Sequence, residues 1–184
     1  MTKKADRMLR LMDRATALWH IPVIGAEKGR LIRQLVRQRR PSRAIEIGSL
    51  LGYSAILIAS HLPPAGRLTC VEGNGFLARL VERNVEEAGL ARRVAVVTGD
   101  ALRVIPALRS RFDFALIDAD KEEYLDYLRQ LEPKLRRGAI VVADNTKIHR
   151  RAVGDYLRYV RAGGRYASRE HDFGFDAMEV SVLS

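Results

Sequence analysis

The feature that most constrains the fold of this 184-residue chain is a regular alternation of strand-like and helix-like segments through its middle. Short apolar runs, bounded by glycine, proline or acidic residues, are separated by segments whose apolar residues have helical spacing. Strands separated by helices are typical of βαβ units, and therefore of a parallel sheet. The predicted strands of this part are 43–48, 66–73, 93–100, 112–120 and 138–145.

The segments before and between these strands are predicted helices. In 76–89 the apolar residues lie on one helical face, and Gly89 is the expected C-cap. The other predicted helices are 27–40, 53–62, 101–110, 122–135 and 147–162. The last segment, 165–184, predicts two strands joined by a turn at 172–174, so one edge should be antiparallel. The sequence therefore predicts a three-layer α/β fold with about seven strands, as a single domain over 1–184.

Composition narrows the setting and the class of partner. Apolar residues make up 47% of the chain, enough for a large core, yet no apolar run is long enough to span a membrane. The only cysteine, Cys70, lies in a predicted strand, and the N-terminus lacks a signal-peptide core. We therefore expect a cytoplasmic protein without membrane attachment.

The net charge of +10 is unevenly distributed along the chain. Residues 1–43 carry twelve Lys and Arg against three acids, and residues 134–169 carry ten against two. Such basic flanks can bind nucleic acid or another anionic partner. The alternative is a solvated surface in a chain that favours arginine, since 26 of its 32 basic residues are Arg.

In an open parallel sheet, ligands bind beyond the carboxyl ends of the strands, so the residues at those ends form the candidate site. The first strand ends in "EIGSLLGYS", in which Gly48 and Gly52 flank a turn into a helix after Glu46. Glycine serves where φ is positive or where backbone approaches a ligand closely. The alternative is an ordinary strand-to-helix turn, because this spacing is not the dinucleotide-binding pattern.

The second and third strands also end in acidic residues. Glu72 follows the glycine turn by the interval at which an acid can accept the hydroxyls of a ribose. Asp100 could reach an adenine edge, or it could simply cap the next helix. Together with the glycine turn, Glu72 indicates a ligand that contains a nucleoside.

The fourth and fifth strands end in "IDADK" and "VVADN". Neighbouring strands would bring Asp118, Asp144 and Asn145 together, and oxygen ligands of this kind suit Mg²⁺ or another hard divalent cation. Lys121 would lie on the first helical turn beside the cation, where a lysine can act as a base. The alternative for Asp118 and Asp120 is helix capping and compensation of the helix dipole.

With these residues assembled, the chain resembles the cation-dependent O-methyltransferases that use S-adenosylmethionine, such as the catechol and caffeoyl-coenzyme A enzymes. The segments "VEGN", "GDALRVIPAL", "IDADKEEYLDYL" and "VVADN" follow one another in the order and spacing of that family. The resemblance runs from about Ile24 to the C-terminus. The chain departs from the family in a shorter N-terminal part and in Ala119, where the animal catechol enzymes have histidine.

The resemblance implies a role for each matched position. Lys121 would take the proton of the methylated hydroxyl, and Glu170 would bind a second hydroxyl of the substrate. The implied metal ligands are Asp118, Asp144 and Asn145. The implied contacts of S-adenosylmethionine are Glu46, Gly48, Ser49, Gly52, Tyr53, Glu72, Asp100, Ala101 and Asp118.

The activity that the resemblance implies is Mg²⁺-dependent methylation of a catechol-like small molecule. An alternative within the same chemistry is methylation of 5-hydroxyuridine in tRNA, with the basic flanks binding the RNA. A non-catalytic cofactor-binding or RNA-binding protein is a third possibility. Family resemblance also implies a homodimer, and the N-terminal segment 1–22 is expected to be helical and to cover the pocket or contact the partner.

Overall fold

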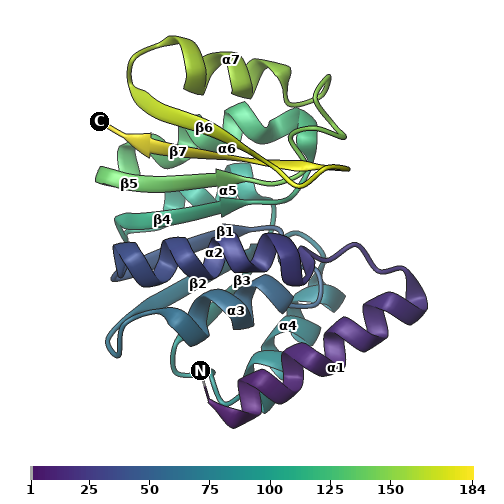
Figure 1. Ribbon diagram of the computed structural model, residues 1–184. Coiled ribbons are helices and arrows are strands. Elements are labelled where there is room, and N and C mark those ends of the chain that lie inside the picture. Colours follow the sequence, from purple (N-terminus) through teal and green to yellow (C-terminus); the bar gives the residue numbers. More distant parts are fainter. Residues whose placement is uncertain (1) are drawn as a thin grey trace.

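A computed structural model describes residues 2–184, and Met1 lies outside the described residues. Figure 1 shows a sheet between two layers of helices. The seven strands have the order β3-β2-β1-β4-β5-β7-β6. Their bounds are β1 Arg43–Ile47, β2 Arg67–Glu72, β3 Val94–Thr98, β4 Phe112–Ile117, β5 Leu135–Ala143, β6 Tyr166–Asp172 and β7 Ala177–Leu183. The pairings among β1 to β5 are parallel, whereas β7 is antiparallel to both β5 and β6, which confirms the predicted α/β sheet.

Alternate strand residues face two separate cores. One core packs α1 to α4 against one face of the sheet, and the other packs α5 to α7 against the opposite face. The helices are α1 Lys3–Trp19, α2 Gly25–Arg39, α3 Tyr53–His61, α4 Gly75–Glu87, α5 Ala101–Ala107, α6 Tyr124–Leu131 and α7 Gly154–Ala162. Two 3₁₀ turns, η1 Lys121–Glu123 and η2 Glu132–Lys134, flank α6.

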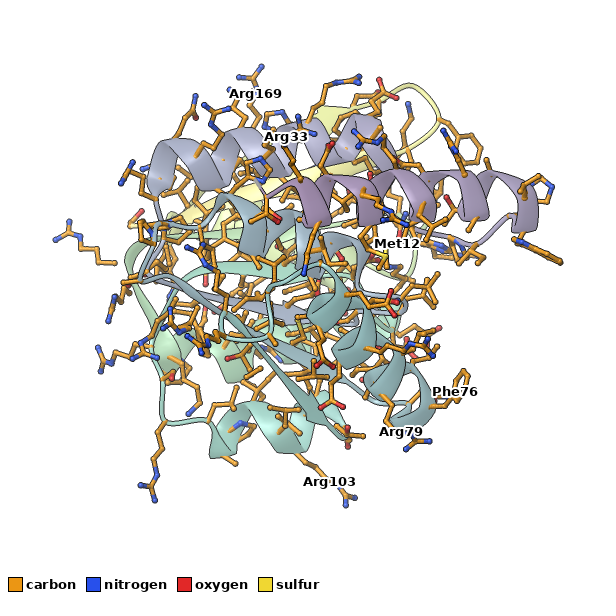
Figure 2. All side chains as sticks on the ribbon, turned by 90° about the horizontal axis from the view of Figure 1, so that it is seen from below. Met12, Arg33, Phe76, Arg79, Arg103 and Arg169 are labelled. Carbon is orange, nitrogen blue, oxygen red and sulfur yellow. The ribbon has the colours of Figure 1, made fainter. Side chains whose placement is uncertain are left out.

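The helix within the N-terminal segment is amphipathic. Ala5, Met8, Leu9 and Met12 of α1 are buried in the same core as α3 and α4, and Figure 2 shows Met12 on the side of α1 that faces the rest of the molecule. The Thr2 side chain caps α1 by accepting a hydrogen bond from the Ala5 amide. No helix among residues 2–184 is both long and apolar enough to cross a membrane.

The parallel ladder continues past the ends of three central strands. The Gly48 amide donates to the Val71 carbonyl, the Asp118 amide to Ile47, and the Asp144 amide to Ile117, each at 2.9 to 3.1 Å. These bonds fix the first residue after each strand in register with its neighbours. The carboxyl edge of the sheet therefore presents the glycine turn and two aspartates side by side.

The largest error in a predicted helix boundary concerns the start of α7. The helix expected over 147–162 begins at Gly154, and residues 147–153 form turns. The Lys147 side chain and the Ile148 amide are instead bound to the turn before β7, through Asp172 and Asp176 respectively. These long-range ties hold the segment at the carboxyl edge of the sheet.

Candidate functional site

Gly48 lies against the end of β4. Its φ is +82°, and a Cβ atom added there would lie 2.3 Å from the Asp118 carbonyl oxygen. No side chain fits at such a distance, so the turn after β1 requires glycine both for its backbone conformation and for this close approach. Gly52 also has a positive φ, of +83°, and stands as the N-cap of α3.

Glu46, on β1, is hydrogen-bonded to the turn between β1 and α3. Its Oε2 accepts hydrogen bonds from the Ser49 hydroxyl at 2.7 Å and from the Cys70 thiol at 3.3 Å, while its Oε1 is buried without a partner among residues 2–184. Complete burial raises the pKa of Glu46 to about 7, against the hydrogen bonds of Ser54, Ser49 and Cys70. Cys70 itself is fully buried, as its place in a strand predicts.

Glu72 ties the end of β2 to the same turn. Its Oε2 accepts the backbone amides of Ser49 and Leu50 at 2.9 and 3.0 Å, and its Oε1 accepts the amide of Asn74. The carboxylate is nearly buried and lines a cavity. Glu72 therefore shapes the turn, and Oε1, which accepts one hydrogen bond, keeps an acceptor site for a ligand in that cavity.

Lys121 stands over the end of β4. Its Nζ lies 2.8 Å from Asp118 Oδ1 and 2.8 Å from the hydroxyl of Tyr124. The Tyr124 hydroxyl donates in turn to the carbonyl of Asp144, and burial raises the pKa of Tyr124 well above its ordinary value. The ammonium group is thus fixed next to the two aspartates of the carboxyl edge.

A second lysine reaches the same edge from α2. The Nζ of Lys28 lies 2.5 Å from Asp144 Oδ1 and 2.5 Å from Asp176 Oδ2. Burial and then the neighbouring Asp118 raise the pKa of Asp144 above its ordinary value, although Lys28 opposes this. Asp176 is less buried, and hydrogen bonds led by that of Lys28 lower its pKa to about 2 despite partial desolvation. The deeper burial of Asp144 and the like charge of Asp118 beside it account for the difference between the two pKa values.

Two cavities of about 320 Å³ each meet at Asp118. Gly48, Leu50 and Asp118 line both of them. One cavity is otherwise lined by Ile47, Val71, Glu72, Gly73, Leu77, Asp100, Ala101, Ala119 and Tyr127. The other is lined by Pro22, Val23, Ile24, Ser49, Tyr53, Ser54, Lys121, Asn145 and His149. Twelve of the thirteen sequence-predicted site residues are thus at one edge of the sheet, in or beside two adjoining cavities.

The donor set at this edge fits a hard divalent cation. Among residues 2–184 no group of three His, Cys, Asp or Glu side chains could hold a metal ion, and the set here is two carboxylates and one amide. Oxygen ligands are those that Mg²⁺ prefers, and it keeps several waters in its shell, so a small protein set suffices. The repulsion between Asp118 and Asp144 is what a bound cation would relieve.

Two of the capping alternatives are realised. Asp100 accepts the Leu102 amide at 2.9 Å as the N-cap of α5, and it also lines a cavity. Asp120 accepts the Glu122 amide at 3.1 Å at the start of η1, and its side chain is exposed. Asp120 is therefore a cap at the turn that presents Lys121.

Glu170 lies apart from this site, against the expectation that it binds a substrate hydroxyl. Glu170 lies on β6, which is two strands away from β5 in the sheet, and it pairs with Glu179 of β7. Its Oε2 accepts from Arg150 at 2.6 Å and from Arg161 of α7 at 2.8 Å, and it lines neither cavity. Its strand position turns the carboxylate toward the helix layer, and two arginines hold it there.

Sequence reasoning missed Lys28 and Asp176. Lys28 falls in the arginine-rich helix α2, where a single lysine looks like one more solvated charge, and Asp176 falls in the turn predicted to join the last two strands. The side chains of Lys28 and Asp144 are nevertheless only 12% and 3% exposed. A signal did exist, because Lys28 is the only lysine among the basic residues of 27–40.

A family model and curated relatives both identify the chain as similar to O-methyltransferases. A family model described as O-methyltransferase matches residues 3–156. The chain is 35% identical over 150 residues to catechol O-methyltransferases of Bos taurus and Sus scrofa, covering 78% of this chain in each case. The match spans 80% of the pig protein but only 54% of the cattle protein, about half of its length.

Solved structures share the whole fold. An O-methyltransferase from Streptomyces achromogenes, in complex with S-adenosylmethionine, aligns with a TM-score of 0.85 at 25% identity and covers 100% of this chain and 91% of its own. An O-methyltransferase from Bacillus cereus aligns with a TM-score of 0.84 at 23% identity, over 100% of this chain and 92% of its own, which speaks for the fold alone. The seven-stranded arrangement is therefore one that proteins of this kind share.

Proposed function

Because this chain belongs to the O-methyltransferase family, we propose that it moves the methyl group of S-adenosylmethionine to a hydroxyl of a small, catechol-like molecule. The observation that carries the proposal is the meeting of two cavities at Asp118, directly beside Lys121. A donor and an acceptor bound on either side of this point would have their reacting atoms next to a candidate base. Such positioning is a large part of what a methyl transfer requires.

The cavity beside β2 and β3 suits the nucleoside of the cofactor. Glu72 would accept the ribose hydroxyls, while Asp100 and Ala101 would border the adenine. Gly48, Ser49 and Tyr53 would border the methionine part in the adjoining cavity, with Glu46 holding the turn. S-adenosylmethionine would supply a methyl group on a sulfonium; the electron pair of the broken C–S bond would stay on the sulfur, which becomes a neutral thioether.

Asp118, Asp144 and Asn145 would hold Mg²⁺ beside the cavity that Lys121 lines, which we call the acceptor cavity. The cation would lower the pKa of the acceptor hydroxyl and fix its direction. Lys121, as the neutral amine, would receive the hydroxyl proton at Nζ as the new C–O bond forms. Its hydrogen bonds to Asp118 and Tyr124 keep that nitrogen at the junction of the cavities.

The acceptor class is inferred from the curated relatives and from the placement of charge. The catechol O-methyltransferases named above act, by their names, on vicinal hydroxyls of a small aromatic ring. The tRNA alternative would need basic charge around the acceptor cavity. Ten exposed arginines lie instead next to the starts of parallel strands, at the opposite edge of the sheet: Arg39, Arg40, Arg43, Arg67, Arg92, Arg109, Arg111, Arg136, Arg137 and Arg165. We therefore favour a small-molecule acceptor.

Three further predictions stay with this proposal. A homodimer and a cytoplasmic location are carried over from the family resemblance and the sequence. Pro22, at the end of the N-terminal segment 1–22, lines the cavity that Lys121 also lines, as do the next residues Val23 and Ile24, whereas Trp19 is 76% exposed. That exposed side chain is free to contact a large acceptor or a partner subunit.

The test is an activity screen of the purified protein with S-adenosylmethionine and Mg²⁺. Catechols, caffeoyl esters and tRNA containing 5-hydroxyuridine serve as acceptors, each with and without EDTA. We expect turnover of a catechol that EDTA abolishes and Mg²⁺ restores. Methylation of tRNA alone would replace the acceptor class, and undiminished turnover in EDTA would contradict the role of the metal.

A further inference from the structure

Asp144 and Asn145, the two proposed metal ligands that directly follow β5, form hydrogen bonds with residues that are not proposed metal ligands. Asn145 has a left-handed backbone, with φ of +58°, which is uncommon for a residue other than glycine. Its side-chain Nδ2 donates to Asp176 Oδ2 at 2.7 Å, the same oxygen that Lys28 Nζ approaches. An amide that gives its nitrogen to Asp176 presents its oxygen on the other side. Asp176 therefore sets which end of the Asn145 amide is available to a cation.

Lys28 likewise sets which oxygen of Asp144 is available to a cation. It donates to Asp144 Oδ1, which also accepts the Asn145 amide at 2.7 Å. The hydrogen bonds among residues 2–184 leave Asp144 Oδ2 without a donor. The lysine thus occupies one oxygen of the carboxylate and leaves the other for a ligand.

The side chains of this network are largely shielded from solvent. The side chains of Lys28, Asp144 and Asp176 are 12%, 3% and 7% exposed. Asp176 is held further by the Ile148 amide on its other oxygen. A buried lysine between two buried carboxylates costs much in desolvation, so the fold gains little stability from it over an apolar contact. What the arrangement supplies is a single orientation for two neighbouring polar side chains.

We propose that Lys28 and Asp176 are positioning residues that orient Asp144 and Asn145 for a divalent cation. This inference rests on the proposed function, because it concerns the same edge of the sheet. Partners of metal ligands commonly matter for affinity by 10- to 100-fold, although they never touch the metal. A lysine is an unexpected partner, since its charge repels a cation.

That repulsion makes the test decisive. If Lys28 were merely a nearby charge, Lys28→Met would remove a repulsion and tighten cation binding. If it positions Asp144, the same change frees the carboxylate and weakens binding. The two roles therefore predict opposite signs for one measurement, which needs no turnover.

The experiment measures Mn²⁺ affinity by electron paramagnetic resonance, with S-adenosylhomocysteine present and no acceptor. We expect Lys28→Met to weaken Mn²⁺ binding by about 10- to 100-fold, and Lys28→Arg to recover part of the loss. S-adenosylhomocysteine affinity, measured by calorimetry on each variant, should stay within about 2-fold and reports that the variant is folded. The matched control is Lys147→Met, which removes a lysine that pairs with Asp172 at the same edge and should leave Mn²⁺ affinity unchanged.

Asp176→Asn is the second variant, and it serves if Lys28→Met does not fold. It keeps the shape of the side chain, but its NH2 group cannot accept the hydrogen bonds that the two carboxylate oxygens accept from Lys28, Asn145 and Ile148. It should weaken Mn²⁺ binding and broaden the manganese spectrum, as the Asn145 amide loses its fixed direction. Equal or tighter Mn²⁺ binding in Lys28→Met, with unaltered binding in Asp176→Asn, would overturn the positioning role. Absence of Mn²⁺ binding by the unaltered protein would instead contradict the metal in the proposed function, so the two failures are distinct.

Discussion

At the scale of single residues, Glu46 is a carboxyl group whose protonation near neutral pH is tied to the fold. Its ordinary pKa of 4.5 rises to about 7 in the folded chain because it is fully buried. Between these values the folded state holds a proton that the unfolded chain has released. The free energy of unfolding therefore falls as pH rises through this window.

Glu46→Gln should remove that fall. At pH 5 the two proteins should be of similar stability, and at pH 8 the variant should be more stable, by up to about 3 kcal/mol for this size of shift. Urea unfolding at both pH values measures the difference, and subtracting the two proteins cancels other titrating groups such as Asp144. Parallel pH profiles would show that the Glu46 carboxyl is ionised in the fold.

Lys121 is the residue on which the proposed chemistry depends most. Lys121→Met should lower kcat by about 10²- to 10⁴-fold, the usual contribution of a positioned base. Affinity for S-adenosylhomocysteine should change little. A kcat within a few fold of the unaltered protein would assign the proton to solvent or to another group.

At the scale of elements, the close approach of the β1–α3 turn to the end of β4 joins the two cavities. A Cβ at Gly48 would be 2.3 Å from the Asp118 carbonyl, so Gly48→Ala must push two segments of the site apart. Gly138 in β5 offers a matched control: its φ is +77°, and nothing lies within 4 Å of its added Cβ. Both changes strain the backbone by about 1–2 kcal/mol.

Only Gly48→Ala adds a clash at the site. It should lower the unfolding temperature more than Gly138→Ala and weaken S-adenosylhomocysteine binding at least 10-fold, while Gly138→Ala leaves the affinity unchanged. Differential scanning fluorimetry and calorimetry give the two readings. Equal losses in both variants would mean that backbone strain alone, and not the approach to Asp118, matters at this turn.

The elements were largely predictable because their signals are local. Apolar spacing, glycine and proline boundaries and acidic strand ends lie within a few residues of one another, and they locate the parallel strands and place Asp118, Asp144 and Lys121 correctly at one edge. Glu170 shows the limit of this reasoning. It lies in the predicted strand, yet its carboxylate is held by Arg161 of α7, a contact that no local pattern contains. Lys28 is the converse, a helix lysine whose buried partner is 116 residues away.

At the scale of the whole molecule, charge is divided between the two edges of the sheet. The exposed arginines at the strand starts oppose the acidic residues at the strand ends, where Asp118, Asp144 and Asp176 gather. Arg79, Arg103 and Arg169 point outward from separate parts of the surface (Figure 2). Most of the clustered basic charge therefore lies at the edge where the parallel strands start, although other arginines lie elsewhere on the surface. The arginines clustered at that edge repel one another.

Reversing charge at the basic edge should relieve this repulsion. Arg92→Glu and Arg137→Glu change exposed arginines that form no ion pair among residues 2–184, and each should raise the unfolding temperature at low ionic strength. The gain should vanish near 1 M salt, where charges are screened over about 3 Å. Arg103→Glu is the control, since Arg103 pairs with Asp100 and should gain nothing. A gain that persists in high salt would point to an effect other than charge.

The insertion of β7 between β5 and β6 has a consequence for how the protein is made. Lys28 and Asp176 are 148 residues apart, and Asp176 directly precedes β7, so the lysine leaves the ribosome long before its partner has been synthesised. β1 to β5 can pair in the order in which they appear, whereas β6 must wait for the strand that separates it from β5. The contacts of Asp176 with Lys28 and Asn145 are thus completed last. A nascent chain can form most of the sheet while its proposed metal ligands are still not oriented.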